Sequence, residues 1–363
     1  MSSAIFTHPE VPFGLKLQLA LAIPLAAVRG VISNVGPTRR SWKRAVHLSI
    51  VRAVLRKLYR GDPPVALKLV GGSTGDTYRA WASARGLPIT SEESGEGGRL
   101  HWIGEKRLKG KVLLFFHGGG YAFPAANDCY NCVLALKQDA EAAVGGLGVA
   151  FLEYSLIPAA PFPAQLRQAT AALSHILSQG VSTADIVLGG DSAGGNLALQ
   201  LCSHILHPLS DLPSPPQLSA PLAGIALISP WTSFHDRYDS FKTNASEDAV
   251  PPRAFTYLAA TASRGVTEKM QHHLEPATAP SGWWAGISDV ASRMVITMGD
   301  KECLYDQDME IAQSLSAHTQ VEKVVQTNGV HEDFIFAFGA GPREGRAGDD
   351  YKAVVAWLKS VLS

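Results

Sequence analysis

The stretch that decides the fold is Asp185-Ile186-Val187-Leu188-Gly189-Gly190-Asp191-Ser192-Ala193-Gly194-Gly195-Asn196. Its apolar first half predicts a buried parallel strand, and the small residues and leucines that follow predict a helix. Between them lies a G-x-S-x-G sequence centred on Ser192, and a sharp strand-to-helix turn is the context in which this sequence carries a reactive serine. The glycines favour such a turn because larger side chains would clash with the neighbouring strand or helix. A tight crossover that merely contains a serine is the alternative.

A second glycine-rich sequence, His117-Gly118-Gly119-Gly120-Tyr121, follows a strand predicted at 111–116. Three consecutive glycines allow backbone N–H groups to approach a bound anion closely. A flexible turn would use glycines as well. As the upstream partner of Ser192, however, the stretch is typical of an oxyanion-hole loop.

Acyl transfer also needs a base and a group that orients the base. The base should follow the last strand of the sheet, where Val330-His331-Glu332-Asp333-Phe334 lies, so His331 is the candidate. The acid should follow the preceding strand. Two carboxylates, Asp300 and Glu302, are available there, and at this point both stay open.

The composition indicates a folded chain and excludes several classes of function. Of its 363 residues, 46% are hydrophobic and 18% are charged, which is typical of a domain with a large core. Lysine plus arginine equals aspartate plus glutamate at 32 each, so we expect no nucleic-acid partner. Four cysteines are too few for a disulfide framework. Cys129-x-x-Cys132 falls in a predicted helix without a second Cys/His pair, so we expect it to pack rather than bind metal.

Apolar runs alternate with helical patterns through most of the chain. Between residues 62 and 110, short alternating pieces such as 99–103 predict edge hairpin strands. The later βα alternation predicts a mostly parallel sheet with helices on both faces. Beyond 111–116 and the strand before Ser192, the predicted strands are 148–154, 224–229, 293–298 and 321–326, and the predicted helices include 161–179 and 350–362.

Between Trp231 and Trp284 the alternation lapses into polar, helical and proline-containing pieces, the composition of an inserted lid. This segment holds one N-glycosylation sequon, Asn244-Ala245-Ser246, which matters only if the chain enters the secretory path. The chain is thereby divided into an N-terminal helical lid segment at 1–60, a core at 61–233 and 281–363, and an inserted lid segment at 234–280.

The N-terminal segment has no basic stretch before its apolar part, which makes it a poor secretory signal. Residues 13–32 are mostly apolar but are interrupted by charged residues, a glutamine and a proline, so they are a marginal candidate for a spanning helix. Residues 41–60 are typical of a basic amphipathic helix, which can cover an apolar pocket or lie on an anionic membrane. We favour the cover and keep peripheral membrane contact as the alternative, with a cytoplasmic or membrane-associated location favoured over secretion.

These motifs resemble those of the hormone-sensitive lipase family of α/β-hydrolases. The glycine loop at 117–121 and the G-D-S-A-G-G sequence at 190–195 match that family. Residues 153–158, with 161–164, resemble its Y-R-L-A-P-E segment, although Ser155, Ile157 and Ala159 replace the expected Arg, Ala and Glu. The likeness runs from residue 111 to the C-terminus and is weaker in the N-terminal segment. It implies an α/β-hydrolase fold with a mostly parallel eight-stranded sheet and a helical lid.

Carried over position by position, the resemblance implies that Ser192 is the nucleophile and His331 the general base. The family's D-x-L-x-D register falls on Glu302-Cys303-Leu304-Tyr305-Asp306, so it implies Glu302 as the acid, with glutamate in place of aspartate and Asp300 as the alternative. The resemblance implies three backbone N–H groups as oxyanion donors, those of Gly119, Gly120 and Ala193.

The function that the resemblance implies is a serine hydrolase of the carboxylesterase or deacetylase type. It would cleave esters of apolar small molecules without a cofactor or metal, and fungal members of the family include steryl-acetyl hydrolases and secondary-metabolism enzymes. One alternative is a non-hydrolytic biosynthetic step, such as a cyclisation, at the same site. A remoter alternative is a non-catalytic ligand-binding protein. The oligomeric state stays open.

Overall fold

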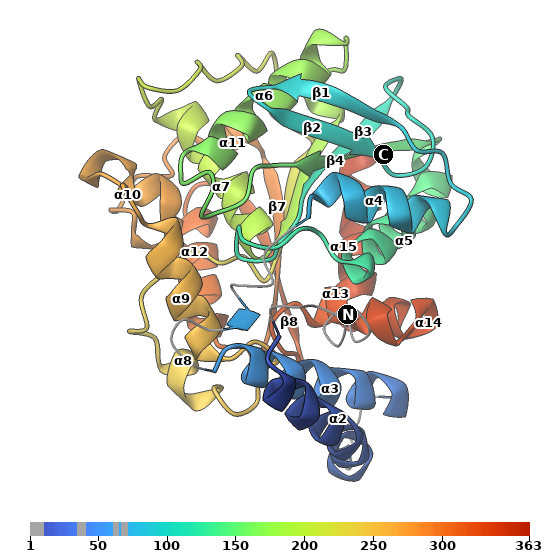
Figure 1. Cartoon of the computed structure of the whole chain (residues 1–363). Helices are drawn as coiled ribbons and strands as arrows, with labels where there is room; N and C mark the ends of the chain where they lie inside the picture. The colour runs from blue at the N-terminus through green and yellow to red at the C-terminus, as the bar shows by residue number, and fades with distance from the viewer. Residues whose placement is uncertain (1–10, 35–40, 61–64, 67–71) are drawn as a thin grey trace.

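A computed structural model of the protein describes residues 11–34, 41–60, 65–66 and 72–363. Within them, eight strands form one sheet in the order β1-β2-β4-β3-β5-β6-β7-β8 (Figure 1). The β1–β2 and β2–β4 pairs are antiparallel, and every other pair is parallel. The strands are β1 (Ser91–Gly95), β2 (Gly98–Trp102), β3 (Lys111–Phe116), β4 (Leu147–Glu153), β5 (Ile186–Asp191), β6 (Gly224–Ile228), β7 (Arg293–Gly299) and β8 (Gln320–Gln326).

Helices cover both faces of this sheet. Successive side chains of a strand point to opposite faces, and in β3 Leu114 belongs to one core cluster while Leu113 belongs to another. The fold class predicted from the sequence is therefore confirmed. The first cluster includes side chains of α6 (Ala164–Ser178), α7 (Ala193–Leu206) and α12 (Tyr305–Ser316), and the second includes those of α4 (Thr74–Ser83), α5 (Asn127–Val144) and α15 (Asp349–Leu362).

The segment between residues 62 and 110 differs from its prediction. The expected edge hairpin is present as β1 and β2, but helix α4 precedes it. The N-terminus of α4 is a capping box, in which the Ser73 side chain accepts from the Asp76 N–H and the Asp76 side chain accepts from the Ser73 N–H. Residue 62 and the predicted boundary at residue 61 lie outside the described residues, and so do residues 1–10, on which the prediction about a secretory signal rests.

Two further groups of helices lie beside the sheet (Figure 1). Helices α2 (Phe13–Ser33) and α3 (Trp42–Leu58) pack on each other, and a Cβ at Gly30 would lie 2.8 Å from the carbonyl oxygen of Ala45. Buried Arg44 of α3 forms an ion pair of 2.8 Å with Asp333. The residues predicted as an inserted segment form α8 (Asp239–Thr243), α9 (Pro252–Ala262) and α10 (Glu268–Leu274). The remaining helices are α11 (Ile287–Val290), α13 (Asp333–Phe336), α14 (Pro342–Arg346), η2 (Thr183–Asp185), η3 (Pro276–Thr278) and η4 (Ala337–Ala340).

Some basic residues of α3 form hydrogen bonds to other parts of the protein. Arg52 donates to the carbonyl oxygen of Asp248, and Arg56 donates to those of Ala245 and Ser246. These acceptors belong to the segment between α8 and α9. The N-terminal helices and the inserted residues are therefore bonded to each other.

Candidate active site

Ser192 occupies the sharp turn between β5 and α7. Its backbone has φ 48° and ψ −114°, a conformation that residues other than glycine rarely adopt. The turn is tight because a Cβ at Gly190 would lie 2.3 Å from the carbonyl oxygen of Gly194, and a Cβ at Gly194 would lie 1.9 Å from that of Phe116. The strained serine is held by its own N–H, which donates to the carbonyl oxygen of Ile228 at 2.9 Å.

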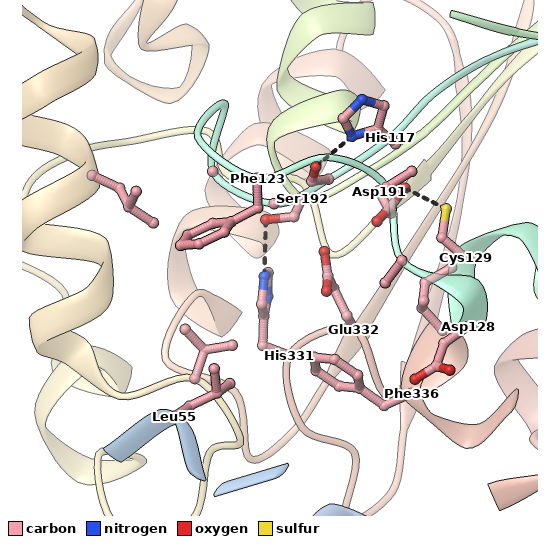
Figure 2. A pocket seen from close by; sticks show the side chains of 18 of the residues that line it. Leu55, His117, Phe123, Asp128, Cys129, Asp191, Ser192, His331, Glu332 and Phe336 are labelled. Atoms are coloured by element: carbon pink, nitrogen blue, oxygen red, sulfur yellow. Dashed lines mark hydrogen bonds between the residues drawn. The ribbon is translucent and has the colours of Figure 1, made fainter. Parts of the chain in front are cut away.

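His331 lies opposite Ser192, on the loop between β8 and α13 (Figure 2). Its Nε2 is 2.9 Å from Ser192 Oγ, and both residues are buried. The backbone N–H of His331 donates to Asp248 Oδ1 at 2.8 Å, and the other oxygen of Asp248 accepts from the Cys303 N–H at 2.7 Å. Asp248, which the sequence analysis did not single out, therefore ties the histidine loop to the loop after β7.

Glu302 is the carboxylate that the structure brings to the other side of the imidazole. Its Oε2 lies 3.6 Å from His331 Nδ1, somewhat longer than a hydrogen bond, and accepts from the Ser229 hydroxyl at 2.7 Å. Asp300 Oδ1 is buried and has no hydrogen-bond partner among the described residues. The side chain of Asn244, the sequon asparagine, donates to the carbonyl oxygens of both Asp300 and Glu302, so it holds this loop.

Asp308 lies behind Glu302 near the start of α12. Both residues are fully buried, and neither Glu302 Oε1 nor either carboxyl oxygen of Asp308 has a conventional donor among the residues that the structure describes. Burial, reinforced by the charge of Glu302, raises the pKa of Asp308 well above its ordinary value. With Asp308 protonated, its O–H can donate to Glu302 Oε1, which gives a partner to that oxygen and to one oxygen of Asp308.

Burial and charge act against each other at His331. Burial disfavours its charged form most strongly, but the contact with Glu302 and the charge of Glu332 outweigh it and raise the pKa of His331 to about 8. The neutral imidazole, which alone can accept a proton from Ser192, therefore becomes the main form only as the pH rises through this value.

The glycine loop lies beside Ser192 with two glycines in the left-handed region. Gly119 has φ 96° and Gly120 has φ 59°, and both line the cavity that contains Ser192. Within the described ranges, no protein acceptor contacts the N–H groups of these two glycines or of Ala193, the residue after Ser192. Backbone N–H groups without a protein acceptor, next to a nucleophile, can stabilise developing negative charge on an oxygen atom.

Two tyrosines hold this loop in place. The Tyr154 hydroxyl donates to the carbonyl oxygen of His117 at 2.6 Å, and its ring stacks on the His117 ring with centroids 4.2 Å apart. Burial lowers the pKa of His117 to about 4, so its ring is neutral and structural. The Tyr121 hydroxyl donates to Asn196 of α7 at 2.6 Å, which fixes the loop to the helix that follows Ser192.

A pair of acids underlies the loop. A Cβ at Gly118 would lie 2.5 Å from both Asp191 Oδ2 and Glu332 Oε1, so these two oxygens converge on the loop (Figure 2). Burial, reinforced by the charge of Glu332, raises the pKa of Asp191 well above its ordinary value. Sequence analysis missed Glu332, whose only signal is its place next to His331.

The cavity above Ser192 has a volume of about 480 Å³. Most of its wall is apolar. Leu55 and Leu58 of α3 contribute to it, and so do Phe255 and Leu258 of α9. Among the residues that the structure describes, no group of three or more His, Cys, Asp or Glu side chains is placed to hold a metal ion.

A family model described as the α/β hydrolase fold matches residues 113–336, more than half of the chain. The chain belongs to the α/β-hydrolase family. An acetyl-hydrolase of Streptomyces hygroscopicus is 31% identical over 222 residues, which cover 61% of this chain and 67% of the relative. The carboxylesterase/phospholipase LipF of Mycobacterium tuberculosis is 32% identical over 162 residues, which cover 44% of this chain and only 39% of that protein.

Solved α/β-hydrolases share the fold. An esterase from the bacterial hormone-sensitive lipase (HSL) family matches with a TM-score of 0.66 and 22% identity, over 89% of this chain and 99% of that chain. The resemblance stated from the motifs is confirmed, and this α/β-hydrolase is an enzyme of the hydrolase class.

Proposed function

We propose that this α/β-hydrolase is a serine esterase that cleaves esters of apolar small molecules. Ser192 is the nucleophile, His331 the general base and Glu302 the acid that orients the imidazole. The observation that carries the proposal is the 2.9 Å distance between Ser192 Oγ and His331 Nε2, in the wall of a largely apolar cavity.

In the proposed reaction, Ser192 Oγ attacks the ester carbonyl carbon while its proton passes to His331 Nε2. The N–H groups of Gly119, Gly120 and Ala193 donate to the carbonyl oxygen as it becomes negative. His331 then returns the proton to the leaving alcohol, which leaves the acyl group on Ser192. Water, which gives a proton to His331 Nε2, then attacks this acyl carbon. The bond between the acyl carbon and Ser192 Oγ breaks, His331 returns the proton to Oγ, and the carboxylic acid leaves.

The cavity supports an uncharged, apolar substrate. Its volume falls in the range of small-molecule sites, about 300–1,000 Å³, and its wall is mainly apolar. Glu332 and Asp128 also line it, and their carboxyl groups disfavour a substrate that carries a negative charge near the ester. The acetyl-hydrolase relative favours a short acyl group.

The N-terminal helices and the inserted segment are proposed to act together as a lid. Leu58 of the N-terminal helices and Phe255 of the inserted segment both line the cavity. Arg52 and Arg56 of the N-terminal helices donate hydrogen bonds to carbonyl oxygens of the inserted segment. Such a cover would exclude bulk water from the acyl-enzyme and admit apolar groups.

A series of chromogenic esters from acetyl to decanoyl tests this function. Measured kcat/KM should be highest for short, uncharged acyl groups and lower for esters with a carboxylate near the ester bond. Modification of Ser192 by an activated ester without turnover of any ester would favour the non-hydrolytic alternative. Binding without any acylation would favour the ligand-binding alternative.

A further inference from the structure

The outer face of α2 is an apolar surface that the rest of the described molecule leaves uncovered. Ten large hydrophobic side chains are exposed in the described residues, and seven of them lie on α2, with an eighth, Trp42, at the start of α3. Those on α2 recur every three or four residues and therefore form one stripe along the helix. The stripe consists of Phe13, Leu17, Leu21, Leu25, Val28, Val31 and Ile32.

The opposite, inner face of α2 is the one that packs against the protein. Leu19, Ala26 and Gly30 are buried, and Gly30 approaches the backbone of α3 closely. A helix on the surface of a soluble domain ordinarily carries polar residues opposite its packed face. The stripe is therefore an unpartnered apolar patch of the kind that marks an interaction site.

The charge around the stripe selects the partner. Between Val11 and Arg60 the sequence has ten lysines and arginines and no aspartate or glutamate, although the whole chain is balanced. Arg44, Arg52 and Arg56 bond within the protein, as described above, and Lys43 lies exposed beside Trp42, with its Nζ 5.9 Å from the ring centroid. A second copy of the chain would place positive charge against positive charge across a twofold interface, whereas an anionic bilayer is complementary.

We propose that α2 and the start of α3 bind the surface of an anionic phospholipid bilayer. In this arrangement α2 lies in the plane of the interface with its stripe among the acyl chains, and Trp42 lies at the level of the headgroups. By length and composition alone, residues 13–32 could also cross a membrane. The packing of the inner face of α2 on α3 favours the interfacial arrangement.

The helix that carries the stripe packs on a helix that lines the cavity. Leu55 and Leu58 of α3 line the cavity, and α3 is the helix on which α2 packs. If the proposed esterase function holds, an apolar ester dissolved in the bilayer reaches Ser192 by passing the N-terminal helices rather than the sheet. Binding itself does not depend on that function.

Vesicle flotation of the full chain tests the proposal, with Ser192→Ala included so that binding is measured without catalysis. Vesicles of phosphatidylcholine with phosphatidylserine should bind the protein, and phosphatidylcholine alone should bind it more weakly. The triple variant Leu17→Glu/Leu21→Glu/Leu25→Glu should bind at least about tenfold more weakly. The matched control Ile89→Glu/Val325→Glu changes exposed hydrophobic residues outside the stripe and should bind as the parent does.

A second variant that changes charge instead of the apolar stripe tests the proposal even if the triple variant folds poorly. Lys16→Gln/Lys43→Gln should weaken binding to anionic vesicles by about fivefold for each charge, with a smaller effect at high salt. Failure of the parent to bind anionic vesicles would overturn the proposal. If the parent forms a concentration-dependent dimer that the triple variant abolishes, the stripe binds a second copy of the chain and the proposal is overturned. If alkaline carbonate fails to extract the protein from vesicles, α2 spans the bilayer and the proposal is likewise overturned.

Discussion

At the scale of single residues, the carboxylate beside His331 is set by a small cluster of groups rather than by Glu302 alone. The Ser229 hydroxyl donates to Glu302 Oε2, the oxygen nearest to the imidazole. The carboxyl group of Asp308 also lies beside Glu302, and its raised pKa favours the protonated form, which can donate to Glu302. Neither Ser229 nor Asp308 belongs to the motif that predicted Glu302.

Replacing each candidate acid separately by its amide tests which one orients the histidine. Glu302→Gln should lower kcat by orders of magnitude, since loss of a triad acid costs about 10⁴ in serine proteases. Asp300→Asn should lower it far less because the structure gives Asp300 no contact with His331. Both values would be measured on one activated ester, and the reverse ranking would assign the role to Asp300.

Asp308 is predicted to position Glu302 through a donated hydrogen bond. Asp308→Asn keeps an N–H donor and should retain most of kcat, whereas Asp308→Leu should lose at least about tenfold in kcat, with KM little changed, since a hydrogen bond to a charged group contributes roughly 1.5–3 kcal/mol. The acid limb of the pH profile should also move in the leucine variant only. Equal kcat and equal pH profiles in the two variants would contradict this role.

The raised pKa of His331 predicts how activity depends on pH. Because only the neutral imidazole accepts the Ser192 proton, kcat/KM should rise with pH through an apparent pKa of about 8. Glu332→Gln removes a negative charge that stabilises the imidazolium, so the limb should shift to lower pH. Asp128→Asn changes another cavity carboxylate, one that is not among the main causes of this shift, and should move the limb much less. A limb that stays fixed in Glu332→Gln would contradict the assignment.

At the scale of elements, one of the contacts that attach α3 is a buried ion pair between Arg44 and Asp333. Arg44→Met would leave the buried Asp333 carboxylate without this guanidinium, and we expect it to lower the free energy of unfolding by about 3–5 kcal/mol. The double variant Arg44→Met/Asp333→Leu removes both charges and should recover most of that loss. Denaturant unfolding of the parent and both variants measures it, and a double variant less stable than the single one would contradict the pairing.

The regular elements were largely predictable, while the contacts between them were not. Apolar runs and glycine-rich turns predicted β3 and the later strands within a residue or two, because a parallel sheet buried on both faces imposes that pattern. Helix α4 was missed although its capping residues, Ser73 and Asp76, were visible in the sequence.

At the scale of the whole molecule, the site depends on contacts that only the folded chain creates. The motifs predicted Ser192, His331 and the glycine loop because the turn and the N–H donors require particular residues at fixed spacing. Asp248 and Ser229 carry no such local signature, and they act only because the sheet brings the loops after β6, β7 and β8 together. The stripe on α2 could be predicted as apolar, but not as exposed.

Mass spectrometry of the intact protein after reaction with a fluorophosphonate tests the central claim most directly. The parent should gain one phosphonyl group, and peptide mapping should place it on Ser192, the proposed nucleophile beside His331. Ser192→Ala should keep the circular dichroism spectrum and the thermal midpoint of the parent but gain no label. Equal labelling of Ser192→Ala and the parent would contradict the account and assign the nucleophile to another residue.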